Sequence, residues 1–261
     1  MPEINTSVAH PARIYDYWLG GKDNFPADRE AAEQVREVLP SVEASARANR
    51  AFMSRAARFL AAEVGIRQFL DIGTGIPTSP NLHEVVQAVT PQARVVYADN
   101  DPIVLVHARA LLTSSPEGRT NYVDADIHDP EKILREAGQV IDFSQPVALM
   151  LVAIMQYVAT SENPYGIVAR LVEAMTPGSY LALSHPTVDV ESSAAAMGMQ
   201  ILNRLLAVRV TPRTHAEVSR FFDGLGLVAP GVVQTTAWRP DPGDDDFGGK
   251  ATMYCGVARK P

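Results

Sequence analysis

The segment at residues 69–78, with the sequence FLDIGTGIPT, carries residue types that could bind a nucleotide-like ligand. An apolar run leads to Asp71, and Gly73 and Gly75 flank Thr74 in the turn that follows. Glycines at these positions permit a tight turn and let a ligand approach the backbone closely. The Asp71 carboxylate would repel a pyrophosphate but attract an ammonium or sulfonium group. The pattern predicts a ligand site, and a turn without a ligand is the alternative.

Polar side chains also end the next predicted strand, which spans Arg94–Ala98. Asp99 and Asn100 follow this strand directly. In open α/β folds, an acid at this position accepts hydrogen bonds from ribose hydroxyls. The alternative is that Asp99 or Asp101 only caps the helix that begins at Pro102.

Two further polar positions are candidates for contact with a ligand. Asp126 and Ile127 follow a third predicted strand, where the carboxylate could bind the exocyclic amine of adenine and Ile127 could pack against its ring. A loop carboxylate without a ligand is the alternative for Asp126. Asn49 lies on the apolar face of a predicted helix, near Phe52. Because a buried amide must find partners, Asn49 binds either a ligand's carboxylate or amine, or the backbone of a neighbouring loop.

In this order and spacing, the three segments resemble those of class I S-adenosylmethionine-dependent methyltransferases. More narrowly, the chain resembles an actinobacterial family of such enzymes with unassigned substrate. The resemblance covers nearly the whole chain, and its most specific stretches are ARIYDYWLGGKDNF at residues 12–25 and the glycine loop through Glu84. Shorter matching stretches are ANRAF at residues 48–52 and FFDG at residues 221–224. The resemblance implies S-adenosylmethionine as cofactor, with Gly73, Thr74 and Gly75 under its methionine part, Asp99 on the ribose, and Asn100, Asp126 and Ile127 around adenine.

The implied reaction moves a methyl group to O, N or C of an unidentified small molecule. The family often carries His after the fourth strand, where this chain has Gln156. A carboxamide cannot take a proton near neutral pH, so we expect Gln156 to orient the substrate and His185 or Tyr157 to be the better base candidates. One alternative is therefore a protein that binds S-adenosylmethionine without turnover. The other is a nicotinamide-dependent oxidoreductase, which Asp71 disfavours, as does Thr78 at the place of the third fingerprint glycine.

The elements around these motifs alternate between strands and helices, which predicts an α/β fold with helices on both faces of a mostly parallel sheet. The resemblance implies a Rossmann-like sheet of seven strands with the last one antiparallel. The predicted strands are Gln68–Ile72, Arg94–Ala98, Thr120–Val123, Val147–Val152, Ser179–Leu183, Leu227–Val233 and Met253–Arg259. The predicted helices between them are Pro80–Val89, Pro102–Leu112, Pro130–Ala137 and Asn163–Met175, and an exposed connection is expected at Pro240–Gly249.

Two helical regions interrupt this alternation. Residues 1–66 are expected to form an N-terminal cover within the same domain, and residues 67–261 the methyltransferase domain, with a helical insertion at 187–212. Both regions are expected over the carboxyl edge of the sheet, where open α/β folds bind ligands. The helix predicted at Val42–Val64 has one basic face, expected to be solvated, with Arg47, Arg55 and Arg58.

Residues 11–25 contain too many large apolar groups for a free tail. Gly20 and Gly21 could hinge this segment, so we predict a lid over the ligand, with a patch over the sheet edge as the alternative. The polar groups expected to reach a closed site are Lys22, Asp23 and Asn24.

Composition narrows the class of protein further. The chain has 261 residues, 46% of them hydrophobic and 20% charged, as globular proteins do, and a net charge of −7. It has no basic stripe for nucleic acid, and its longest uncharged apolar run, Pro146–Ala159, is too short to span a bilayer. The single cysteine, Cys255, excludes an intrachain disulfide, and no His and carboxylate spacing indicates a metal site. Met1 to Trp18 lacks the pattern of a secretory signal, so we expect a cytoplasmic protein whose partner is the small-molecule acceptor.

Overall fold

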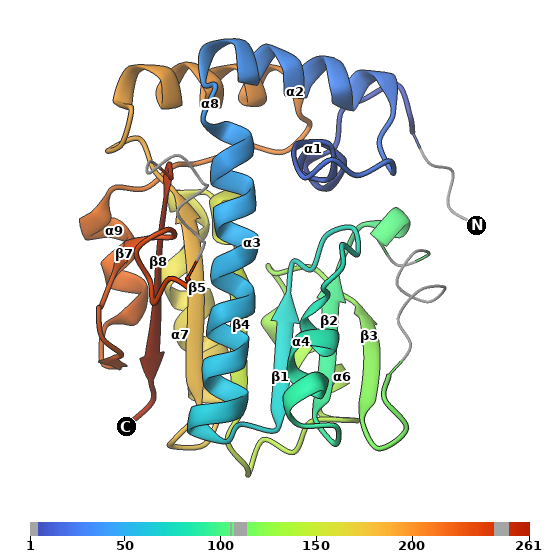
Figure 1. Cartoon of the computed structure of the whole chain (residues 1–261), viewed down its shortest axis with the longest axis vertical. Helices are drawn as coiled ribbons and strands as arrows, with labels where there is room; N and C mark the ends of the chain where they lie inside the picture. Colours follow the sequence, from blue (N-terminus) through green and yellow to red (C-terminus); the bar gives the residue numbers. More distant parts are fainter. Residues whose placement is uncertain (1–4, 105, 107–113, 243–250) are drawn as a thin grey trace.

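The computed structural model of the chain describes residues 5–104, 106, 114–242 and 251–261. In these residues the strands form one mixed sheet in the order β3-β2-β1-β4-β5-β8-β6, with β7 paired to β8 (Figure 1). Strands β1 to β5 run parallel, and β8 runs antiparallel to β5. The predicted Rossmann-like fold with a reversed last strand is confirmed. The strands are β1 Gln68–Ile72, β2 Arg94–Asp99, β3 Arg119–Asp124, β4 Ala148–Val152, β5 Tyr180–Pro186, β6 Gly226–Leu227, β7 Val233–Gln234 and β8 Met253–Arg259.

The prediction of a single strand at Leu227–Val233 is wrong. Two strands of two residues each, β6 and β7, pair antiparallel with β8 on either side of a turn. Pro230 lies in this turn and has no N–H to donate to a sheet, and Gly231 has a φ of +91°. The sheet therefore has eight strands in the described residues rather than the seven expected.

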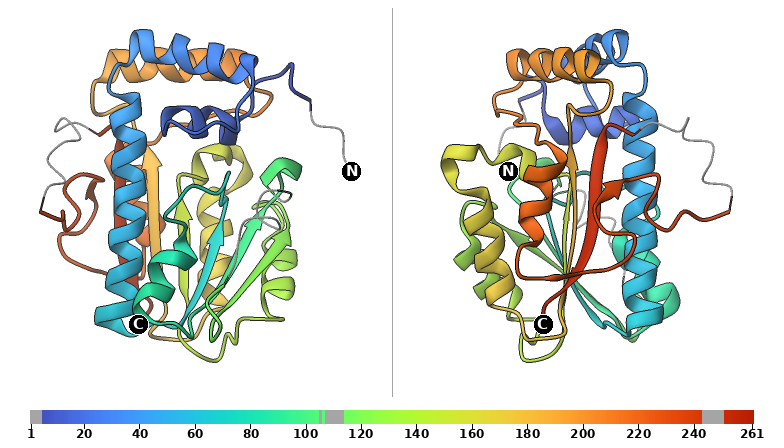
Figure 2. Two further views of the ribbon diagram at one scale, coloured as in Figure 1. Left: turned by 45° about the vertical axis from the view of Figure 1, so that its right-hand side comes forward. Right: turned by 90° about the vertical axis from the view of Figure 1, so that its left-hand side faces the viewer.

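Helices cover both faces of the sheet (Figure 2). On one face lie α3 (Val42–Arg58) and α4 (Leu82–Val89), whose side chains share a core with β1 and β2. On the other face lie α6 (Pro130–Ala137) and α7 (Pro164–Glu173), which share a second core with β4 and β5. The central strands β1, β4 and β5 are buried almost throughout between these two cores, as expected for a parallel sheet that is covered on both faces.

A third layer lies over the carboxyl ends of the parallel strands (Figure 1). It consists of α1 (Pro11–Trp18), α2 (Pro26–Val38) and α8 (Ser192–Leu205). These helices have a small core of their own, which includes Ile14, Val35 and Leu202. The short α9 (His215–Ser219) follows the segment after α8. The structure thus has helical covers from both regions that interrupt the predicted alternation, and α8 lies inside the expected insertion.

Helix α3 begins at Val42 as predicted, and a π-helix at Phe59–Val64 continues it. The expectation that Arg55 lies on a solvated face is wrong, because this side chain is only 4% exposed. Its Nε donates to the carbonyl oxygen of Trp238 at 2.9 Å, and its Nη2 to that of Thr235 at 2.6 Å. Arg55 therefore fastens the segment before β8 onto α3. Arg47 and Arg58 are exposed, as expected.

Two predicted segments fall partly outside the described residues. The helix expected at Pro102–Leu112 is helical at residues 102–104 and 106, and the rest of it lies outside them. Residues 243–249 of the expected connection also lie outside. In the part of the chain that is described, no helix has both the length and the apolar character needed to cross a bilayer.

Candidate functional site

A cavity of about 290 Å³ lies at the carboxyl ends of the parallel strands, and residues of α1 and α8 form part of its wall. The strand order reverses between β1 and β4, and ligands bind in open α/β sheets at such a switch point. All nine residues that the sequence singled out for binding line this cavity. They are Asn49, Asp71, Gly73, Thr74, Gly75, Asp99, Asn100, Asp126 and Ile127.

Gly73 and Gly75, in the loop after β1, are glycines for different structural reasons. Both have left-handed backbones, with φ of +74° at Gly73 and +67° at Gly75. A Cβ on Gly73 would lie 2.5 Å from Cδ1 of Ile154, so this glycine allows the loop to pack against the segment after β4. A Cβ on Gly75 would meet nothing within 4 Å. The backbone at Gly75 is therefore open to a ligand.

Asp99 lies at the end of β2, where its carboxylate faces the glycine loop. Its Oδ2 accepts a hydrogen bond from the Gly75 amide at 2.9 Å, and its Oδ1 one from the Asp101 amide at 2.9 Å. Asp101, not Asp99, accepts from the amide of Ile103 at the start of the next helix, at 2.9 Å. Burial raises the pKa of Asp99, while its backbone hydrogen bonds lower it. Asp99 thus positions the glycine loop and keeps further lone pairs for a ligand.

Asp71 is a buried carboxyl group on the cavity wall, 9% exposed. Burial raises its pKa to about 7, with Arg50 lowering it and Asp99 raising it. Arg50 also lines the cavity, and its Nη2 donates to the carbonyl oxygens of Thr78 and Pro80, each at 2.7 Å. A cation bound beside Asp71 would favour its ionised form.

Asn100 and Asp126 form one hydrogen-bonded group on the β2 and β3 side. Nδ2 of Asn100 donates to Oδ2 of Asp126 at 2.7 Å. Oδ1 of Asp126 lies 2.8 Å from the amide nitrogen of His128 and 2.6 Å from its ring Nδ1. Ile127 is 6% exposed and belongs to the core below. The expected polar group and apolar neighbour therefore lie side by side on the cavity wall.

Asn49 is 1% exposed and already has two side-chain partners. Its Oδ1 accepts from the hydroxyl of Ser184 on β5 at 2.6 Å, and its Nδ2 donates to the Tyr15 hydroxyl at 2.9 Å. Tyr15 in turn donates to the carbonyl oxygen of Ala46 at 3.1 Å. Asn49 joins α1, α3 and β5 at the cavity, and one of its amide hydrogens has no bond among these contacts.

Gln156 and Tyr157 lie in the segment after β4 and line the cavity. Nε2 of Gln156 donates to the carbonyl oxygen of Ala153 at 2.6 Å, which fixes the orientation of the amide. Its Oε1 is buried and has no hydrogen-bond partner among the described residues. Burial raises the pKa of the Tyr157 phenol to about 12, and a hydrogen bond with the Gln156 side chain partly offsets this. Neither side chain takes a proton near neutral pH.

The expectation that His185 is a base near the acceptor is wrong. This side chain is fully buried and is not part of the cavity wall. Its Nδ1 lies 2.8 Å from the carbonyl oxygen of Pro186, and its Nε2 lies 2.6 Å from Nη1 of Arg213. Burial and the Arg213 charge lower the pKa of His185 to about 3. His185 is a neutral, structural group.

Comparison with known proteins decides the family. The sequence profile of the S-adenosyl methyltransferase family matches residues 1–261. The chain belongs to this family. Among curated proteins, no sequence matches it.

Two solved structures resemble this S-adenosyl methyltransferase along nearly its whole length. A DUF574 family protein from Streptomyces avermitilis MA-4680 is 49% identical with a TM-score of 0.96, and the match covers 99% of this chain and 100% of that chain. A candidate methyltransferase from Thermobifida fusca YX is 41% identical with a TM-score of 0.88, covering 99% and 97%. The plantazolicin methyltransferase BpumL, solved with a monoazolic desmethylPZN analog and SAH, is 12% identical with a TM-score of 0.52, covering 96% and 95%. This last likeness shows the shared fold alone.

The cover of this family member differs from the predicted lid. Its cavity is lined by α1 itself, through Tyr15 and Trp18, and by His10 just before it. The prediction that Lys22, Asp23 and Asn24 reach the site is wrong, because none of them lines the cavity. Asp16 instead holds this loop, accepting from the Asp23 amide at 3.0 Å and from Asn24 Nδ2 at 2.8 Å.

Sequence reasoning also missed the apolar part of the methyltransferase cavity. Met199 and Leu202 of α8 line it, and their spacing of three residues on one helix face was the available signal. His10 lines it too, and its Nδ1 lies 3.0 Å from Oδ2 of Asp101. No pattern in the sequence indicates this contact between the N-terminal segment and the loop after β2.

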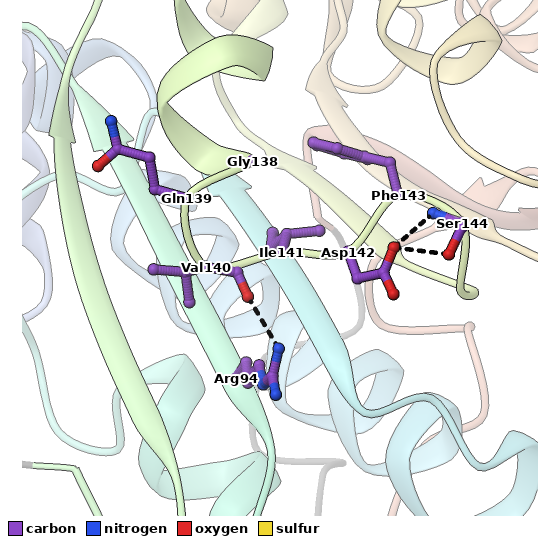
Figure 3. A pocket seen from close by; sticks show the side chains of 8 residues that line it. All are labelled: Arg94, Gly138, Gln139, Val140, Ile141, Asp142, Phe143 and Ser144. Atoms are coloured by element: carbon purple, nitrogen blue, oxygen red, sulfur yellow. Dashed lines mark hydrogen bonds between the residues drawn. The ribbon is translucent and has the colours of Figure 1, made fainter.

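A second hollow lies around Arg94 at the start of β2, at the opposite edge of the sheet (Figure 3). Its polar groups bond one another: Arg94 Nη1 donates to the Val140 carbonyl oxygen at 3.2 Å, and Asp142 Oδ1 accepts from Ser144 Oγ at 2.6 Å. It lies away from the switch point and is not part of the methyltransferase site. Within the described ranges, no three His, Cys, Asp or Glu side chains gather where they could hold a metal ion.

Proposed function

We propose that the chain catalyses methyl transfer from S-adenosylmethionine to O, N or C of a small molecule. The observation that carries the proposal is the meeting of four separate sequence segments in one cavity. These segments contribute Asn49 from α3, residues 71–75 from the end of β1 and its loop, residues 99–100 from the end of β2, and residues 126–127 after β3. Membership of the S-adenosyl methyltransferase family supports the same cofactor.

The residues at this site fit S-adenosylmethionine in shape and charge. The open face of Gly75 leaves room for the cofactor at the loop, and Asp99 beside it is proposed to accept from the ribose hydroxyls. Asn100, Asp126 and Ile127 are proposed to surround adenine. Asp71 is proposed to face the positive charge of the ammonium or sulfonium group, and Asn49 to donate its remaining hydrogen to the carboxylate.

When bound, this cofactor supplies an electrophilic methyl group on a positively charged sulfur. The chain's own contribution is to hold the two reactants in line and to exclude water with α1 and α8. The three groups expected near the acceptor, Gln156, Tyr157 and His185, take no proton near neutral pH. We therefore propose that catalysis rests on alignment rather than on a base among these three groups, and that a protonated acceptor loses its proton to bulk water after the transfer.

Several finer expectations remain proposals of the same kind. The relatives from Streptomyces and Thermobifida support an actinobacterial family. We also propose that residues 1–66 belong to one domain with the sheet, because α3 shares a core with β1 and β2. A nicotinamide-dependent oxidoreductase has no support from the family match.

Calorimetric titration tests the proposal on wild type, Asp99→Asn and the matched control Asp124→Asn. Asp124 ends the neighbouring strand opposite Asp99, is exposed and does not line the cavity. We expect one site for S-adenosylmethionine and for S-adenosylhomocysteine, and none for NAD. Asp99→Asn should weaken the binding of S-adenosylmethionine and of S-adenosylhomocysteine about 10- to 150-fold. This corresponds to the loss of about 1.5–3 kcal/mol, the contribution of a charge-assisted hydrogen bond. Unchanged affinity in Asp99→Asn, or tight binding of NAD, would contradict the proposal, and binding without transfer to any small molecule would favour the non-turnover alternative.

A further inference from the structure

One part of the cavity wall carries the charged side chains, and the other part is uncharged. Among the described residues, every Asp, Arg and His side chain in its wall comes from residues 10–128. These side chains belong to α1 and the segment before it, to α3, to the ends of β1 and β2, and to the loop after β3. From residue 129 onward, the lining side chains that the structure describes carry no charge.

The uncharged part is an apolar chamber on the β4, β5 and β8 side. Its walls come from the end of β5, from α8, from the segment after α8 and from the start of β8. The side chains that form it are Pro186, Met199, Leu202, Val208, Val210 and Met253. Tyr157 packs against the same small core as Leu202 and Val210. This chamber adjoins the proposed cofactor residues in one cavity, so it is the space left for the acceptor.

Gln156 lines the same cavity and has one unmet hydrogen-bond acceptor. The residue is 6% exposed, and its Oε1 has no partner in the described part of the chain. Its side-chain amide is oriented by the bond from Nε2 to the Ala153 carbonyl oxygen, and its backbone is held by the Thr211 amide, which donates to the Gln156 carbonyl oxygen at 2.8 Å. A buried acceptor without a donor is costly, and a ligand that brings an O–H or N–H removes that cost.

We infer that the methyl acceptor is a neutral, largely apolar small molecule whose O–H or N–H donates to Oε1 of Gln156. This inference rests on the proposed function and adds the chemical class of its substrate. A carboxylate or phosphate in the chamber would lose its hydration and find no cation among the six side chains that form it. A neutral ring or chain loses no such hydration and gains the burial of its apolar surface.

Three naphthalene probes of nearly equal size test this inference by fluorescence titration. 2-Naphthol carries an O–H, 2-methoxynaphthalene has an ether in its place, and 2-naphthoate carries a negative charge. Each is titrated into the full chain saturated with S-adenosylhomocysteine at pH 7. We expect 2-naphthol to bind about three- to tenfold more tightly than the ether, as one neutral hydrogen bond allows, and 2-naphthoate to bind least tightly.

Two sets of variants identify the groups responsible. Gln156→Met keeps the length of the side chain but removes the amide, so 2-naphthol and the ether should then bind with equal affinity. Met199→Glu puts a charge into the chamber wall and should weaken both neutral probes at least tenfold. Its control is Met197→Glu, on the same helix, 51% exposed and not part of the wall, which should bind all probes like wild type.

Affinity for S-adenosylhomocysteine, measured on every variant, separates this inference from the proposed function. If wild type does not bind S-adenosylhomocysteine, the proposed function itself is refuted. If wild type binds S-adenosylhomocysteine but binds none of the probes, or binds 2-naphthoate most tightly, the inference of a neutral acceptor is refuted and the proposed function is not. A preference for 2-naphthol that survives in Gln156→Met would overturn the role of Gln156. If Gln156→Met does not fold, the three probes on wild type and the Met199→Glu pair still decide the class of acceptor.

Discussion

Nη1 of Arg213 lies 2.6 Å from Nε2 of His185, and both side chains are buried. Since a guanidinium only donates, Nε2 accepts, and the proton of the neutral ring lies on Nδ1, which donates to Pro186. Arg213 also donates to the carbonyl oxygens of Met155 and Val158, each at 2.8 Å. The pair thus holds the segment that carries Gln156 against the end of β5.

This arrangement predicts a dependence of stability on pH. The pKa of His185 is about 3 in the folded chain and about 6.5 when unfolded. Between these values the unfolded chain binds a proton that the folded chain does not, so His185 lowers stability as the pH falls. Replacing it in His185→Gln should remove up to about 1.4 kcal/mol per pH unit from this slope. Urea unfolding from pH 4.5 to 7.5 checks this, and an unchanged slope would show that His185 takes up its proton in the folded state.

Asp71 should act in the opposite direction. Its pKa is about 7 in the folded chain and about 4 when unfolded, so between these values the folded chain binds the extra proton. Its contribution to stability is present at low pH and is lost as the pH rises to 7. Asp71→Asn should remove that loss and make the variant gain stability relative to wild type as the pH rises. Asp124→Asn, at an exposed position, is the control in the same urea series, and equal behaviour of the two variants would disprove the prediction.

The two glycines after β1 should respond differently to a methyl group. Gly73→Ala forces a left-handed alanine against Ile154 and should cost about 2–5 kcal/mol of unfolding free energy. Adding Ile154→Ala should restore part of that loss. Gly75→Ala should cost only about 1–2 kcal/mol of unfolding free energy, because its methyl group enters open space. The same methyl group should weaken the binding of S-adenosylhomocysteine. Urea unfolding and calorimetry measure the two effects, and equal costs at both glycines would refute the packing argument.

Arg55 should matter for stability far more than its neighbours on α3. Arg55→Ala leaves the carbonyl oxygens of Trp238 and Thr235 without their buried donor, at a cost of about 2–5 kcal/mol. Arg47→Ala is the control, because Arg47 is exposed and lies 3.9 Å from Glu43, and it should change stability by less than about 0.5 kcal/mol. Thermal unfolding of both variants compares them, and similar melting temperatures would contradict the burial of Arg55.

Much of the fold follows from local patterns in the sequence. Strands β1 and β8 have the predicted bounds because turn residues or a change of polarity mark both ends of each apolar run. The polar residues proposed to bind the cofactor lie together because the carboxyl ends of parallel strands meet at one edge. Chain direction and topology thus carry most of the positional information for Asp71, Asp99 and Asp126.

Contacts between distant segments explain where sequence reasoning failed. Helical periodicity puts Arg55 on a basic face, but residues 235–238 fold back to cover it. His185 follows a strand as a ligand residue would, yet Arg213 arrives from another part of the chain and buries it. The apolar chamber was missed because its walls come from four segments whose hydrophobic residues resemble ordinary core positions.

The long helix α3 makes ligand binding and global unfolding a single linked equilibrium. Asn49, Arg50 and Met53 of this helix line the cavity, whereas Arg55, two residues after Met53, fastens the segment before β8. A ligand that binds only the folded form at 100 times its dissociation constant adds about 2.7 kcal/mol to stability. Because α3 cannot leave the cavity without also releasing that segment, the whole gain should be visible as a higher melting temperature. A thermal-shift screen of compound libraries, run with S-adenosylhomocysteine present, is therefore a direct route to the natural acceptor.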